Sequence, residues 1–190
     1  MSLRILIVVG VAILAGAGVL AIATTGPSNG ATPAPSRPVA KRLASAKPLP
    51  APVGDAVLRI TGVTRGNVSA RTTKVDLATL NAVAHESVTV HEPFLKHDVT
   101  FTGVRMSDLL RRAGVKASAR TLHMHALDDY QVDLPIAEIA ADGMLATRAD
   151  GKPIPIAKGG PIRLIFTASS AIAANTDNWI WSLDSVQARG

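Results

Sequence analysis

Apolar residues recur at helical spacing in one segment near the middle of the chain. The positions i, i+3, i+4 and i+7 of this segment are Met106, Leu109, Leu110 and Ala113. Such spacing places the four side chains on one face of a helix. Gly114 follows directly, and glycine at this position commonly ends a helix. We therefore predict a helix over residues 106–113 that packs on the core through its apolar face.

Two later segments, 120–126 and 130–134, alternate apolar and polar residues instead. A period of two is typical of half-buried strands. A short connection between the segments predicts an antiparallel hairpin. In that register His123 lies opposite Asp133, and His125 points to the same face as His123.

The rest of the pattern consists of short strands mixed irregularly with short helices. Further strands are predicted at 58–61, 86–91, 99–101, 144–148, 154–156, 162–167 and 179–183, and short helices after Asp76 and from Pro135 to Ala140. The segment 162–167 is almost continuously apolar, which predicts a central strand. Trp179 and Trp181 alternate on the last strand and are expected in the core. This mixture indicates an α+β domain rather than a doubly wound sheet.

The first 52 residues have a different character from the rest. Residues 5–23 are apolar, Gly or Ala and follow Arg4, which predicts either a cleaved signal peptide or an uncleaved transmembrane anchor over 1–23. Residues 24–52 are rich in Pro and Ala and predict a flexible tether. The folded domain is then 53–190. We expect it outside the cytoplasm, in the periplasm or at the cell surface, either anchored or secreted.

The overall basic charge comes from this N-terminal part. The chain has 20 Lys and Arg residues against 14 Asp and Glu. Five of the basic residues and none of the acidic ones lie in 1–52, so the domain is close to neutral. Aromatic residues make up only 3% of the chain. These features exclude a nucleic-acid-binding surface. The chain has no cysteine, so the core alone must stabilise the domain without disulfides.

Four phrases stand in a fixed order along the domain: GVRMSDLL at 103–110, DDYQVDLP at 128–135, LATRADGKP at 145–153 and GPIRLIF at 160–166. Their order and spacing resemble the molybdopterin-binding oxidoreductase domain of the sulfite oxidase family. The resemblance covers roughly residues 55–188. It implies a mixed, sheet-rich, sulfite-oxidase-type α+β fold with a groove for the pterin.

The resemblance also implies a molybdenum centre held by the pterin dithiolene and one cysteine thiolate. That cysteine follows a strand, and the corresponding window here reads His91-Glu92-Pro93-Phe94. Without cysteine the chain cannot supply the thiolate. His91 or Glu92 could ligate the metal instead, but base rates for polar residues favour two loop residues at a strand end. The resemblance thus implies molybdopterin as a cofactor, whereas the residues predict that none is bound.

The family phrase His-Gly-x-Pro-x-Arg, which is associated with cofactor contacts, appears here as KGGPIR at 158–163. Glycines such as Gly159 and Gly160 let backbone N–H groups approach a phosphate, and an arginine such as Arg163 can bind it with two hydrogen bonds. Together with Lys158 these residues are candidates for binding an anion or a pterin-like ligand. The alternative, slightly favoured, is a Gly-Pro turn that enters a core strand, with Arg163 paired to a carboxylate.

A metal candidate independent of the family lies on the predicted hairpin. His123 and His125 point to one face of a strand, with Asp133 nearby, as a zinc or copper site requires. Two such ligands are common by chance, and a His–Asp cross-strand pair on a polar sheet face explains the same residues. We favour the latter.

Two hypotheses follow for function. The first is an exported binding module without molybdenum catalysis, whose partner is a small anionic ligand or another protein. The second is an oxidoreductase that holds molybdopterin through a ligand other than cysteine or through contacts to the pterin alone. The chain carries no Gly-x-Ser-x-Gly phrase, phosphate loop or zinc-protease helix motif, so the sequence does not favour the corresponding enzyme classes.

Overall fold

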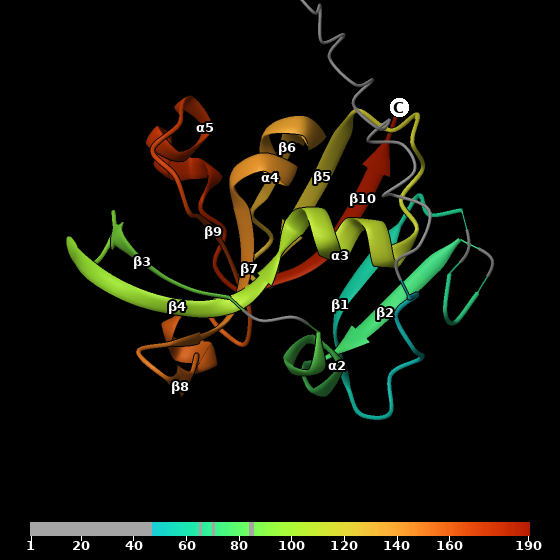
Figure 1. Ribbon diagram of the computed structural model, residues 1–190, viewed down its shortest axis with the longest axis horizontal. Coiled ribbons are helices and arrows are strands. Elements are labelled where there is room, and N and C mark those ends of the chain that lie inside the picture. The colour runs from blue at the N-terminus through green and yellow to red at the C-terminus, as the bar shows by residue number, and fades with distance from the viewer. Residues whose placement is uncertain (1–46, 65, 70, 84–85) are drawn as a thin grey trace, which may run out of the picture. The chain divides into compact units, whose positions relative to one another are not determined.

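The computed structural model describes residues 47–64, 66–69, 71–83 and 86–190 (Figure 1). Its elements in chain order are β1 (Ala56–Thr61), β2 (Thr72–Asp76), α2 (Leu77–Ala82), β3 (Glu86–Glu92), β4 (His97–Arg105), α3 (Met106–Ala113), β5 (Thr121–Ala126), β6 (Gln131–Pro135), α4 (Ile136–Asp142), β7 (Gly143–Ala149), β8 (Lys152–Pro153), η1 (Ile156–Lys158), β9 (Arg163–Phe166), α5 (Ala171–Ala174), η2 (Thr176–Asn178) and β10 (Leu183–Arg189). The predicted signal peptide or anchor lies outside the described residues. Within them, no helix has the length and apolarity needed to cross a bilayer.

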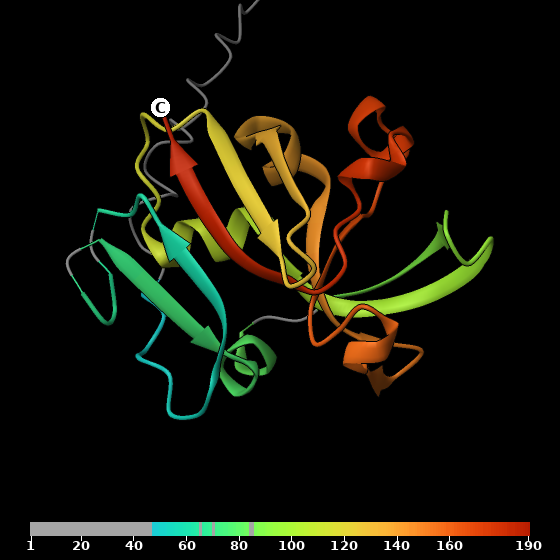
Figure 2. The same cartoon turned by 180° about the vertical axis from the view of Figure 1, so that it is seen from behind.

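The strands form two sheets of different connectivity. The first has the order β2-β1-β10-β5-β6, and only its β1–β10 pair is parallel. Seen from behind, β10 (red) lies between β1 (teal) and β5 (yellow) (Figure 2). The second sheet has the order β3-β4-β7-β8, and β9 also pairs with β7. The fold is therefore of the predicted α+β, sheet-rich type.

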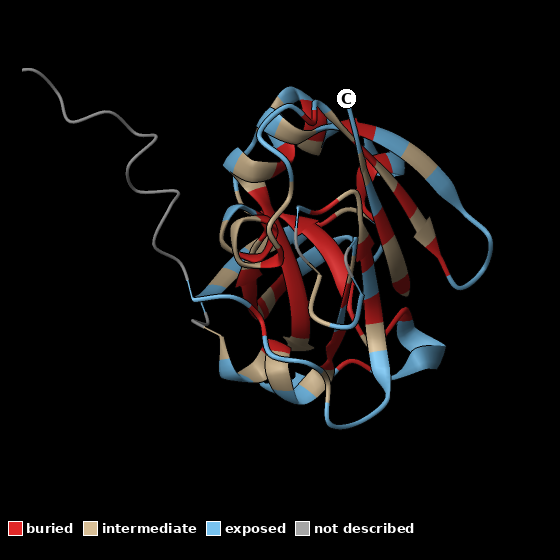
Figure 3. Ribbon diagram, turned by 90° about the vertical axis from the view of Figure 1, so that its right-hand side faces the viewer, coloured by how far each residue is buried: buried red, intermediate tan, exposed pale blue. Residues whose placement is uncertain are grey.

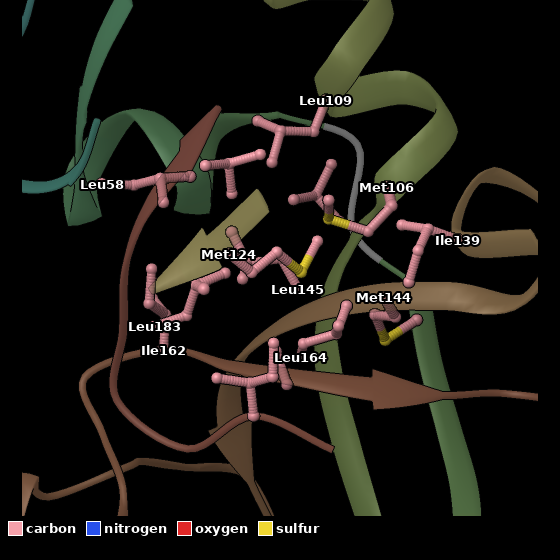
Figure 4. Packing of buried hydrophobic residues seen from close by; sticks show 14 of the residues in the cluster. Leu58, Met106, Leu109, Met124, Ile139, Met144, Leu145, Ile162, Leu164 and Leu183 are labelled. Atoms are coloured by element: carbon pink, nitrogen blue, oxygen red, sulfur yellow. The ribbon is translucent and has the colours of Figure 1, made fainter. Parts of the chain in front are cut away.

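Helices α3 and α4 connect the two sheets through their apolar faces. Helix α3 contacts β4 and β7 of the second sheet, and α4 contacts both β6 of the first sheet and β7 of the second. Met106, Met124, Ile139 and Leu145, from the two helices and the two sheets, are all fully buried. Figure 4 shows these side chains gathered in one core. In Figure 3, the central strands are coloured red because they are buried, and most turns are pale blue because they are exposed.

Local sequence patterns explain several elements. Gly114 adopts a left-handed backbone with φ of 76° and ends α3, as predicted. The Asp76 carboxylate accepts a hydrogen bond from the Thr79 N–H at the start of α2, which confirms the predicted helix cap. The hairpin register is also confirmed, since His123 pairs with Asp133 across β5 and β6.

Three predictions near the C-terminus were wrong in detail. The strand expected at 154–156 is the two-residue β8, because Pro153 and Pro155 lack the N–H groups that would extend the pairing. The last strand starts at Leu183 rather than Trp179, since Ser182 has a positive φ of 51° that breaks an extended run. Strand β9 is fully buried but not central: it pairs with β7 on one side and has an isolated bridge to Ile180 on the other.

The boundary between the predicted tether, residues 24–52, and the folded domain lies too far toward the C-terminus. Leu49 is only 4% exposed and belongs to the core, and its N–H donates to the carbonyl of Arg112. Pro50 is held as well, because its carbonyl accepts a hydrogen bond from Asn67. Composition predicted an unpacked segment, but one apolar residue among the prolines fixes it to the domain. Residues 24–46 of the predicted tether lie outside the described part.

Candidate functional site

The candidate site begins where β3 turns into β4. Glu92 is the last residue of β3, and its side chain is fully buried. A tight turn returns the chain, in which the Lys96 N–H donates to the Glu92 carbonyl at 2.8 Å with Lys96 in a left-handed conformation. The Leu95 N–H donates to Oε2 of the Glu92 carboxylate at 2.5 Å. The turn therefore holds this carboxylate inside the protein rather than at the surface.

Arg163, the first residue of β9, lies against the same carboxylate. Its Nη1 is 3.6 Å from Oε1 of Glu92, and the two side chains are 4% and 1% exposed. Its Nη2 donates to the Lys158 carbonyl at 2.7 Å. The guanidinium also stacks over the ring of Trp181, with 3.8 Å from Cζ to the ring centroid. Arg163 is thus paired with a carboxylate, which is the alternative that the sequence offered.

The buried pair is incompletely hydrogen-bonded. Oε1 of Glu92 and Nε of Arg163 have no hydrogen-bond partner among the described residues. A distance of 3.6 Å is an ion-pair contact rather than a hydrogen bond. Burial lowers the pKa of Arg163 from its usual value, and the Glu92 carboxylate opposes that shift. The two charges therefore neutralise each other in the interior, at the cost of two unpaired polar atoms.

The glycines of the phrase at 158–163 have packing roles here. A Cβ atom at Gly159 would lie 2.7 Å from the Trp181 ring, and one at Gly160 would lie 1.9 Å from the Ile154 carbonyl oxygen. Both positions therefore require glycine for close packing, and neither needs a phosphate to explain it. The side chain of Lys158 points away into solvent, as an exposed residue of η1.

Two cavities open beside the Glu92–Arg163 pair. The larger, of about 480 Å³, lies between β3 and the α5 segment, which face each other in Figure 1. It is lined by His91, Pro93 and several hydroxyl side chains. The smaller, of about 320 Å³, is lined by Phe94, Asp128, Tyr130, Thr176, Asp177, Trp179 and Trp181. Among the residues lining either cavity there is no Lys or Arg.

These residues do not fit the molybdenum cofactor as the family binds it. The window in which the family has its thiolate ligand contains His91, Glu92 and Pro93 here. The Glu92 carboxylate already forms an ion pair with Arg163. His91 is largely exposed, and its Nδ1 lies 3.1 Å from Oδ1 of Asp98. The only arginine of the cofactor phrase is buried and paired, so no cationic side chain faces a phosphate from the cavity walls. The window thus offers no thiolate donor, and the linings of the two cavities offer no Lys or Arg.

The hairpin histidines bond to separate carboxylates. Nδ1 of His123 lies 2.9 Å from Oδ1 of Asp133, and Nδ1 of His125 lies 2.6 Å from Oδ1 of Asp184. The hydrogen bond to Asp184, opposed by burial, raises the pKa of His125. Over the described ranges, no three His, Asp or Glu side chains form a group suited to a metal ion. The His–Asp cross-strand pair that the sequence favoured is present.

Two contributors to the site were missed from sequence. Trp181 was expected on a core strand, but it is half-buried and covers Arg163. Phe94 was noted only as part of the ligand window, yet it packs edge-on against Trp181 with 5.6 Å between ring centroids. Neither contact has a local pattern in the sequence, because the residues belong to distant turns.

Comparison with known proteins agrees with this geometry at the level of fold. A similar solved structure is the sulfane dehydrogenase SoxCD from Paracoccus pantotrophus, with a TM-score of 0.56 and 18% identity over 70% of this chain and 37% of that one. An identity this low shows a shared fold alone. The model of the family described as oxidoreductase molybdopterin binding domain matches residues 63–188. The chain belongs to the oxidoreductase molybdopterin-binding domain family.

A curated relative is also partly similar. The protein named "Uncharacterized oxidoreductase YuiH" of Bacillus subtilis (strain 168) is 33% identical over 70 residues, which is 36% of this chain and 35% of that protein. The chain therefore matches little more than a third of the length of either relative.

Proposed function

We propose that this domain is a ligand-binding member of its family that works without the molybdenum–thiolate centre. The observation that carries this proposal is the buried Glu92–Arg163 ion pair in the window of the thiolate ligand. A cysteine there would present a metal donor, whereas Glu92 presents a carboxylate already engaged by the protein. The same pairing removes Arg163 from any role in binding phosphate.

Energetics support the pair as a structural replacement. Removing one partner of a buried ion pair leaves an uncompensated charge, at a cost of about 3–5 kcal/mol. A cofactor that recruited Arg163 or Glu92 would have to compensate that cost with new contacts. Such a rearrangement has no cationic side chain in the cavity walls to support it.

The test is the cofactor content of the full chain after expression in a host that makes molybdopterin. We expect molybdenum and released pterin far below one per chain, while a cysteine-containing family member from the same host is loaded. Stoichiometric molybdenum would overturn the proposal.

The second hypothesis, an oxidoreductase with an oxygen ligand, has one observation in its favour. Oε1 of Glu92 is buried without a hydrogen-bond partner and could serve as a metal donor. If the chain carries molybdenum, Glu92→Gln should remove it and His91→Gln should leave it. Equal loading of both variants would exclude Glu92 as the ligand.

We further propose that the domain is exported, either anchored through an uncleaved N-terminal segment or released after cleavage of a signal peptide. The support is the apolar run at 5–23 directly after Arg4, followed by a Pro-rich stretch. Cell fractionation with an alkaline phosphatase fused after the domain tests export, and N-terminal sequencing of the product tests cleavage near Ala23. Phosphatase activity confined to the cytoplasm would contradict export.

A further inference from the structure

The smaller cavity gathers most of the aromatic side chains of the protein. The whole chain has three Phe, two Trp and one Tyr. Both Trp, the Tyr and one Phe line this cavity of about 320 Å³. We call Phe94, Tyr130, Trp179 and Trp181 the aromatic cage. In a chain so poor in aromatic residues, their convergence marks this cavity as a built feature.

The cage is assembled from three separate segments. Phe94 comes from the β3–β4 turn and Tyr130 from the β5–β6 turn, while Trp179 and Trp181 follow η2. The planes of Phe94 and Trp181 meet at 77°. Hydrogen bonds fix the other two rings: the Tyr130 hydroxyl donates to the Asp177 carbonyl at 2.7 Å, and Nε1 of Trp179 donates to the Ala173 carbonyl at 2.9 Å. These contacts hold the rings in place without a ligand.

Two of the rings remain accessible. Phe94 is 48% exposed and Tyr130 is 39% exposed. Leaving large apolar surface in water is unfavourable. A ligand that covers these rings would recover that free energy. Accessible rings around a cavity are therefore suited to binding.

The charge at the cavity is negative. Asp128 and Asp177 are exposed residues of its lining, which contains no Lys or Arg. Arg163, which lies over the Trp181 ring, is paired with Glu92. Burial raises the pKa of the Tyr130 hydroxyl, and the charge of Asp177 adds to the shift. A cation bound in this cavity would therefore lie among acidic and aromatic lining residues, with the Trp181 ring also in contact with Arg163.

We propose that the aromatic cage binds a small organic cation carrying a quaternary ammonium group. Such a group has no N–H to satisfy and attracts aromatic faces strongly. The cavity volume lies at the lower end of the range of about 300–1,000 Å³ for ligand pockets, which fits a small molecule. The inference deepens the proposed function, since it replaces the expected anionic ligand by a cationic one.

Intrinsic fluorescence gives a direct test, because both Trp residues of the chain belong to the cage. The full chain is titrated with choline, with 3,3-dimethylbutan-1-ol as its uncharged isostere, and with ethanolamine as its unmethylated analogue. We expect a saturable change with choline and much weaker responses to the other two. No saturable response to choline overturns the proposal. Equal binding of the isostere removes the role of charge, and equal binding of ethanolamine removes the quaternary group.

Matched variants locate the binding. Phe94→Ala and Asp177→Asn should each weaken choline binding by ~5-fold, given the size of cation–π and charge interactions. Leu95→Ala removes an exposed neighbour of Phe94 outside the cavity lining, and Asp55→Asn removes an exposed carboxylate elsewhere; both should keep the affinity. Circular dichroism checks that each variant is folded. Equal affinity in all four variants would place the binding elsewhere and overturn the proposal.

Molybdenum is assayed in the same samples. A loaded protein overturns the proposed function whatever choline does. If the protein carries no molybdenum and does not respond to choline, the proposed function is retained and the proposal that the cage binds a quaternary ammonium group is rejected.

Discussion

At the scale of single residues, the fate of the buried charges decides what this site can do. Glu92 and Arg163 come from elements far apart in the chain and meet in the interior. Burial of each charge costs several kcal/mol, and the partner offsets this only while both are present. Their contribution should therefore appear as a coupling between two substitutions rather than as the effect of either one.

A double-mutant cycle tests this coupling. Glu92→Met and Arg163→Met alone should each lower the free energy of unfolding by about 3–5 kcal/mol, because each leaves an unpaired buried charge. The double variant should be within ~1 kcal/mol of the parent, since two apolar side chains then replace the pair. Urea unfolding followed by circular dichroism measures all four proteins. Additive losses would mean that the pair is not coupled.

The sequence pointed to both residues of this pair, but it did not reveal the contact between them. The family phrase pointed to Arg163 and the ligand window pointed to Glu92, and a carboxylate partner for Arg163 was expected without a name. Glu92 becomes the partner of Arg163 because the turn at Leu95 and Lys96 directs the Glu92 carboxylate inward. That turn has no strong pattern, because Lys96 adopts a left-handed backbone without being glycine.

At the scale of elements, helices and hairpins whose interactions lie within one short segment were predictable from the sequence. Helix α3 depended on its own apolar spacing and on Gly114, and the β5–β6 register depended on alternation across a short turn. Elements defined by distant partners were not predictable. The apolar run of β9 could not reveal whether a strand or a loop covers its second side, and here Ile180 of a loop does so.

The β5–β10 pair should show a pH-dependent stability through His125. The Asp184 carboxylate raises the pKa of His125 in the folded protein above its usual value of 6.5. Folding therefore favours the protonated ring, and this stabilisation is complete below about pH 6.5. It is lost as pH rises through the folded-state pKa.

Thermal unfolding across this alkaline limb measures the effect. Asp184→Asn should lower the midpoint at acidic pH and flatten its fall as pH rises, whereas the exposed Asp55→Asn should keep the parent profile. A parent profile that is flat from pH 6 upward would contradict the assignment.

At the scale of the whole molecule, the folded unit begins before its composition suggests. Leu49 belongs to the same core as the two sheets and helices. Leu49→Ala should therefore lower the free energy of unfolding by about 2–5 kcal/mol, as for other buried leucines. Leu127→Ala is the matched control, because Leu127 is 55% exposed, and surface changes usually stay within about 0.5 kcal/mol. Equal, small effects in urea unfolding would restore the boundary at Pro52.

The aromatic cage also belongs to this scale, and no local pattern could predict it. Its rings come from three turns separated by most of the domain, and only the topology of the two sheets brings them together. Alternation even suggested that Trp181 was a strand residue in the core. The composition shows how few aromatic residues the chain has, but it cannot show that four of the six converge on one cavity.

The bridge between Leu164 and Ile180 has a consequence for how the cage can operate. The two residues exchange backbone hydrogen bonds of 2.9 and 3.2 Å, and Ile180 stands between the two tryptophans. The segment that carries both indoles is thereby also the cover of the free edge of β9. Opening it would uncover strand amides to solvent hydrogen exchange and invite pairing with another chain. We therefore expect Trp179 and Trp181 to keep their positions when a ligand binds, so that any adjustment of the cage falls on Phe94 and Tyr130.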